Sequence, residues 1–234
     1  MFPSLMSKTF LILSISLTLC YLGAQAVVSY YRYAFRNKRK FVTAVKNEQG
    51  QDDLVVDSQH LMWVFWPAMI VNILCFIGLM AFRSEFPAKM AWMGLFTLSD
   101  GITLGVVLIS VDENLALKVA WLTALITLFA GTLGLYSNVN FAPLGKYLMW
   151  GLWILLAFLT VNLFVSIKSA TQRIMSGFGV LLFTGYLLFD FNRINRLKDV
   201  ELYDNWNQAL GLAISIYLDI INLFLHLLRL LSKK

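Results

Sequence analysis

The sequence predicts an all-α integral membrane protein, a bundle of seven transmembrane helices. Hydrophobic residues make up 59% of the 234 residues. Charged residues make up only 14%, well below the roughly 25% typical of soluble domains. The mean hydropathy is +0.71. Apolar stretches long enough to cross a bilayer, about 17 to 25 residues each, recur along the whole chain.

Each apolar stretch is expected to form one helix, and together they make a single membrane domain over 1–234. The expected spans are about 8–31, 61–82, 89–110, 115–136, 146–166, 174–190 and 208–230. Residues 32–60 carry both signs of charge and are expected to form a polar connecting loop, amphipathic or disordered. Small residues at helical spacing predict close helix packing in the third span (Gly101, Gly105) and the sixth (Gly177, Gly179, Gly185).

The basic residues predict the orientation in the membrane. Of the 19 Lys and Arg, seven fall on the side of the N-terminus and twelve on the other side if all seven spans cross. Cytoplasmic loops carry the excess of Lys and Arg, so the C-terminus is expected in the cytoplasm. We favour the bacterial inner membrane, and the endoplasmic reticulum is the alternative. The basic residues lie at helix ends, which favours a lipid bilayer and not nucleic acid as their surroundings.

The last span carries a polar face along an otherwise apolar helix. Seven-residue spacing aligns one row of polar residues, and Asp219 and His226 form a second row beside it. The whole face comprises Gln208, Gly211, Ser215, Asp219, Asn222, His226 and Arg229. Such a face is expected to contact other helices or water and not lipid. Ser215, Asn222, His226 and Arg229 are therefore candidates for lining a pathway, the alternative being that they only hold helices together.

Two acids on consecutive spans predict a carboxyl pair. Asp190 is the only acid in the sixth span, and Asp219 lies within the seventh. An unpaired charge at membrane depth costs several kcal/mol. Two carboxyl groups at contact distance cannot both ionise easily in a low dielectric, so they are expected to share a proton and to titrate near physiological pH. When ionised, the pair could hold a calcium ion, because hard cations prefer carboxylate oxygens.

Two further charged residues belong to this hypothesis. Asp100 in the third span is a third intramembrane acid, with a pathway role and a capped position near the interface about equally favoured. Arg83, at the end of the second span, is the basic residue that we would pair with Asp190 or Asp100, on location alone.

The C-terminal residues "ISIYLDIINLFLHLLRLL" resemble the closing signature of the transmembrane Bax inhibitor motif family, the Bax inhibitor-1-like membrane proteins. "GYLLFDFNRI" and "LSDGITLGVV" resemble the family's sixth and third helices. The resemblance implies seven helices with the C-terminal one at the centre. It also implies a pH-sensitive calcium leak in which Asp190 and Asp219 act as the sensor, with Arg83 matching an arginine that exchanges partners with the first of them.

Three functions remain in view, and no enzyme is favoured among them. The first is a passive calcium or proton pathway gated by the Asp190–Asp219 pair. The second is a stress or cell-death modulator that transports nothing and binds another membrane protein, such as a membrane protease. Intramembrane aspartyl proteolysis is disfavoured, because the sequence lacks a Gly-x-Gly-Asp and a Pro-Ala-Leu motif. No phosphate loop, H-E-x-x-H motif or Cys cluster suggests a bound cofactor.

Overall fold

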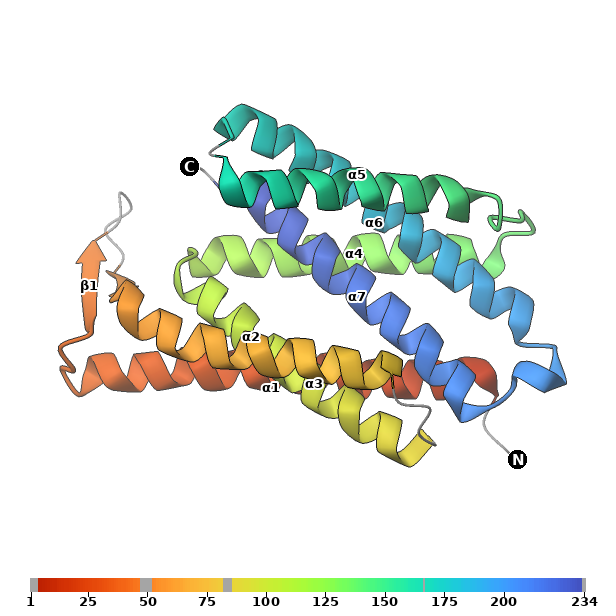
Figure 1. Cartoon of the computed structure of the whole chain (residues 1–234), viewed down its shortest axis with the longest axis horizontal. Coiled ribbons are helices and arrows are strands. Elements are labelled where there is room, and N and C mark those ends of the chain that lie inside the picture. Colours follow the sequence, from red (N-terminus) through yellow and green to blue (C-terminus); the bar gives the residue numbers. More distant parts are fainter. Residues whose placement is uncertain (1–3, 47–51, 82–85, 166, 233–234) are drawn as a thin grey trace. The chain divides into compact units, whose positions relative to one another are not determined.

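Seven long helices dominate the part of the chain that the computed structural model describes, residues 4–46, 52–81, 86–165 and 167–232 (Figure 1). The helices are α1 (Leu5–Arg36), α2 (Ser58–Ala81), α3 (Phe86–Ile109), α4 (Glu113–Tyr136), α5 (Leu144–Phe164), α6 (Ser169–Leu197) and α7 (Trp206–Leu231). All seven are long and apolar enough to cross a membrane. The predicted multi-pass membrane fold is confirmed.

The helices extend beyond the apolar stretches that predicted them, most of all in α6. The expected sixth span was 174–190, whereas α6 begins at Ser169 and ends at Leu197. The helix continues through Arg193 and Arg196, because polar residues at the membrane surface keep helical geometry after the apolar run has ended. Asp190 therefore lies about two turns inside the helix and not at its end.

The chain forms two compact units. One contains the described residues of 1–13 and 115–234, and the other contains Ser14–Asn114. In the first unit, α7 packs along α6, and α6 also packs against α5. In the second unit, α2 packs along α3. Of the seven candidate spans, α7 is the most buried, with 56% of its apolar window inside the protein against 11 to 39% for the others.

The connection between α1 and α2 corrects the prediction of a loop. It holds two antiparallel strands, β1 (Val42–Lys46) and β2 (Asp52–Val56), in which Val42 pairs with Val56 and Lys46 with Asp52. The strands form because Val42 and Val56 are buried in an apolar cluster with the end of α1 and with α3. The mixture of charges made this segment the candidate for an ordered piece outside the membrane and left an amphipathic or a disordered loop open, and the β-branched residues supply a buried anchor at the base of the hairpin.

Small residues allow α1 and α3 to approach closely in the second unit. A Cβ atom on Gly101 would meet the Cα of Cys20 at 2.9 Å, and one on Gly105 would meet the carbonyl oxygen of Ala24 at 2.9 Å. The predicted packing role of these two glycines is confirmed. In α6, Gly185 faces Leu148 and Gly179 faces His226, whereas Gly177 has open space around it, so the prediction of a packing role was wrong for Gly177.

Candidate functional site

Asp190 and Asp219 meet between α6 and α7. Their carboxyl groups lie within reach of a hydrogen bond to each other. Both residues are buried, with exposed fractions of 5% and 7%. A hydrogen bond between two carboxyl groups requires that one of them carries the proton, because an ionised carboxylate can only accept. The structure therefore brings together the two acids that the sequence pattern paired.

One oxygen of this pair has no partner. Asp219 Oδ2 is buried and has no hydrogen-bond partner among the described residues. A buried polar atom without a partner costs about 1 to 3 kcal/mol. An oxygen in this position can accept a hydrogen bond from a water molecule.

The neighbourhood of the pair follows from the packing of two antiparallel helices. His226 lies two turns after Asp219 on α7, and Phe183 lies two turns before Asp190 on α6. The rings of Phe183 and His226 are stacked with their centroids 5.6 Å apart. The His226 ring fills the space that a side chain at position 179 would need, so Gly179 permits this contact. His226 is buried, and its Nδ1 has no hydrogen-bond partner within the described part of the chain.

The polar face predicted for α7 divides into two rows of different burial. Asp219 and His226 lie on the buried stripe of the helix, in line with Leu212, Ile216 and Leu223. The other row is less buried: Gln208, Ser215 and Asn222 are half-buried and Arg229 is exposed. The Asn222 amide donates to the Leu218 carbonyl of its own helix at 2.8 Å. Asp219 and His226 are thus the polar residues of this face that lie inside the protein.

Of the remaining predicted residues, Asp100 belongs to the other compact unit and Arg83 is outside the described residues. Asp100 is half-buried in α3, in the unit formed by Ser14–Asn114. Its carbonyl oxygen accepts a hydrogen bond from the Thr103 hydroxyl at 2.7 Å. Arg83 lies outside the described residues, so its pairing with an aspartate stays a prediction.

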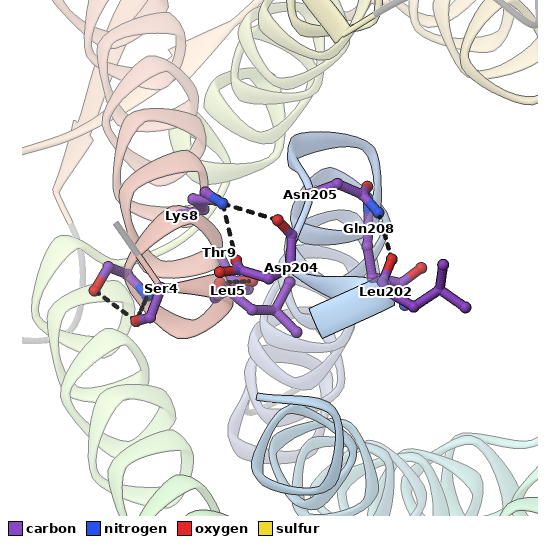
Figure 2. Close-up of polar contacts among 9 residues, drawn as sticks. Ser4, Leu5, Lys8, Thr9, Leu202, Asp204, Asn205 and Gln208 are labelled. Atoms are coloured by element: carbon purple, nitrogen blue, oxygen red, sulfur yellow. Dashed lines mark hydrogen bonds and ion pairs between the residues drawn. The ribbon is translucent and has the colours of Figure 1, made fainter. Parts of the chain in front are cut away.

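A buried ion pair near the start of α7 was not foreseen from the sequence. Lys8 is only 6% exposed, and its Nζ donates to Asp204 Oδ1 at 2.8 Å and to the Asp204 carbonyl oxygen at 3.1 Å. Figure 2 shows Lys8 reaching from the first turns of α1 to the connector before α7. Nζ also lies 5.7 Å from the centre of the Trp206 ring. Lys8 stands at the start of the first expected span, 8–31, where a lysine is normally an anchor at the membrane surface.

The connector itself is fixed by a helix cap. Asn205 is the N-cap of α7, and its side-chain oxygen accepts from the Gln208 backbone N–H at 2.9 Å (Figure 2). A cap of this kind satisfies one of the free N–H groups of the first helical turn. The Lys8 contact with Asp204 and the Asn205 cap together fix the position of the start of α7.

A possible metal role of the acids is limited by the number of ligands. Calcium takes six to eight oxygens. Among the described residues, no group of three or more His, Cys, Asp or Glu could hold a metal ion. Two carboxyl groups offer at most four oxygens, fewer than calcium takes.

Seven apolar helices and an acid pair buried between two of them define a multi-pass integral membrane protein with ionisable groups inside its bundle. Residues 3–234 match the family model described as "Inhibitor of apoptosis-promoting Bax1". The chain belongs to this Bax inhibitor family, as its C-terminal residues had suggested.

Several relatives share the same region. Protein LIFEGUARD 1 of Arabidopsis thaliana is 28% identical over 184 residues, which cover 77% of this chain and 75% of the relative. Bax inhibitor 1 of Schizosaccharomyces pombe is 26% identical over 183 residues, covering 74% and 66%. The Golgi anti-apoptotic protein of Vaccinia virus (strain Lister) is 33% identical over 150 residues, covering 64% of this chain and 60% of the viral protein.

Proposed function

We propose that this protein is a calcium leak channel whose pathway opens when the Asp190–Asp219 pair loses its shared proton. The observation that carries the proposal is the contact between two buried carboxyl groups on neighbouring transmembrane helices, which lie within reach of a hydrogen bond to each other. Intramembrane acids are costly, so a buried pair of them is by default a functional hypothesis.

The chemistry of the pair sets the direction of gating. While one proton is shared, the O–H···O bond joins α6 to α7 and the pair carries a single negative charge. When that proton leaves, two carboxylates face each other in a low dielectric and repel. Separation of the helices then admits water, which solvates both charges and the free oxygen of Asp219. The two carboxylates attract cations, so calcium flux is expected to rise as the pH rises.

The other candidate residues take supporting roles in this proposal. His226 and Asp219 lie on the same buried stripe of α7, so His226 is the polar group that follows Asp219 on that stripe and would line the pathway next. Asn222 and Ser215 flank this stripe, and Arg229 stands at its exposed end. Arg83 is proposed to pair with Asp190 in the closed state.

The experiment places the purified protein in liposomes with a calcium indicator inside and follows calcium entry between pH 6 and pH 8. The wild-type protein is expected to show flux that rises with pH. Asp219→Asn and Asp190→Asn are expected to lose this pH dependence, because an amide cannot release the shared proton. Asp199→Asn is the matched control, since Asp199 is an exposed acid on the connector between α6 and α7. Flux that is independent of pH, or that keeps its pH dependence in Asp219→Asn, would overturn the proposal.

A second candidate is a modulator that transports nothing and acts by binding another membrane protein. The printed names of relatives favour it, since one is called a Golgi anti-apoptotic protein and another Bax inhibitor 1. Its test combines the liposome assay with cross-linking in native membranes. A defined membrane-protein partner, together with an absence of flux at every pH, would support this candidate against the leak channel.

A further inference from the structure

Two arginines at the end of α6 line a pocket of about 330 Å³. Arg193 and Arg196 are one helical turn apart, so both side chains reach the same side of the helix. The rest of the lining comes from α6, the connector to α7, the start of α7 and the segment between α4 and α5: Ala142, Phe189, Asn192, Leu197, Tyr203 and Gln208. All of these residues lie in one compact unit.

The polar side chains of the pocket differ in whether they already form hydrogen bonds. The Asn192 side chain does: it donates to the carbonyl oxygens of Gly134 and Val139, each at 3.1 Å, and accepts from the Phe141 N–H at 3.2 Å. It closes one wall of the pocket. Across the described ranges, by contrast, neither Arg193 nor Arg196 forms an ion pair or a hydrogen bond.

A structural explanation for the two arginines is incomplete. Cations near the C-terminus of a helix interact favourably with its dipole, and Arg193 also feels the charge of Asp190 one turn earlier. These effects account for positive charge at this end of α6. They do not require that both arginines line one hollow, together with Gln208 and Tyr203.

We propose that this pocket binds a phosphate group, supplied by the headgroup of an anionic phospholipid. Two guanidinium groups can each donate two parallel hydrogen bonds to phosphate oxygens, which is the geometry that arginine offers and lysine does not. The pocket lies near the end of a helix that is long and apolar enough to cross a membrane, after its apolar run has ended, which is where a lipid phosphate is within reach of an arginine. Phe189 and Leu197 give it an apolar wall against which the glycerol and the upper acyl carbons can pack.

The test uses the full-length protein in a neutral detergent and native mass spectrometry with added phosphatidylglycerol. Diacylglycerol with the same acyl chains is the control lipid, because it differs only in lacking the phosphate and its headgroup. The wild-type protein is expected to retain phosphatidylglycerol and not diacylglycerol. Arg193→Gln with Arg196→Gln is expected to weaken retention by about tenfold for each arginine removed, since each loses a charge-assisted pair of hydrogen bonds.

The matched control variant is Lys198→Gln, which removes one exposed positive charge just beyond the pocket. It is expected to retain the lipid as the wild type does. Arg196→Gln alone provides a second variant, since Arg196 is exposed and its loss leaves the packing of α6 intact. Equal retention in the wild type and the double variant would overturn the proposal, and so would equal loss in Lys198→Gln.

A competition experiment distinguishes a lipid headgroup from free inorganic phosphate as the ligand. If inorganic phosphate at millimolar concentration displaces the lipid and binds by itself in an arginine-dependent manner, the site takes the free anion. If inorganic phosphate neither binds nor competes while phosphatidylglycerol does, the headgroup is the ligand. Binding of neither species overturns the site. None of these outcomes depends on calcium flux, so this inference and the leak channel fail independently.

Discussion

Replacing Lys8 by Met keeps the unbranched side chain except for its terminal ammonium group and removes the charge, and so measures how much the ion pair with Asp204 contributes to stability. Lys8 Nζ makes two hydrogen bonds, to Asp204 Oδ1 at 2.8 Å and to the Asp204 carbonyl oxygen at 3.1 Å. A hydrogen bond that involves a charged group contributes about 1.5 to 3 kcal/mol. The side chains are 8% and 35% exposed, so water can replace part of what Asp204 loses. We expect Lys8→Met to lower the free energy of unfolding by about 1 to 2 kcal/mol.

The assay is a double-mutant cycle on the purified protein, with Lys8→Met, Asp204→Asn and the double variant unfolded under the same conditions. The coupling free energy is expected to be about 0.5 to 2 kcal/mol, because the two side chains are in direct contact. Lys198→Met is the control, since Lys198 is exposed. Additive effects of the two substitutions, or equal losses for Lys8→Met and Lys198→Met, would refute a stabilising ion pair at this position.

Two further predictions concern the packing of glycines and the hydrogen bonds of Asn192. Gly101→Ala is expected to destabilise the protein by about 1 to 3 kcal/mol, because the backbone of Cys20 occupies the space of the added methyl group. Gly177→Ala is expected to be neutral or to stabilise the protein by up to about 1 kcal/mol, since nothing lies within 4 Å of the added methyl group. Melting curves of the two variants check the pair, and equal effects would contradict the assigned packing. Asn192→Leu is expected to cost about 2 to 4 kcal/mol because three hydrogen bonds are lost and their backbone partners stay buried in part. Faster hydrogen exchange at Phe141 would locate the damage, and unchanged exchange there would contradict it.

The helices and the acid pair could be predicted from the sequence because their signals are local. An apolar stretch must form a helix in lipid, since every backbone group has to be satisfied within it. An acid within such a stretch needs a partner, and the nearest acid along the chain to Asp219 within another span was Asp190. Both inferences use one residue type and its spacing.

The hairpin, the Lys8–Asp204 pair and the Arg193–Arg196 pocket depend on contacts that spacing cannot reveal. Lys8 and Asp204 are 196 residues apart. A lysine close to the start of an apolar stretch is normally a surface anchor, and only the packing of α1 against the connector buries it. Similarly, the seven-residue rows of α7 placed Ser215 and Asp219 on one face, but residues four apart on an α-helix point about 40° away from each other. Burial therefore favours Asp219 and His226 over their neighbours.

The shared proton is tested most directly by infrared difference spectroscopy of the protein in lipid between pH 6 and pH 8. A carbonyl band of a protonated carboxyl group should be present at the lower pH and should disappear over the same interval in which calcium flux rises. The band should be missing in the variant that carries both Asp190→Asn and Asp219→Asn, and unchanged in Asp199→Asn. A band that persists while the flux rises, or a flux that rises without any such band, would contradict gating by the Asp190–Asp219 pair.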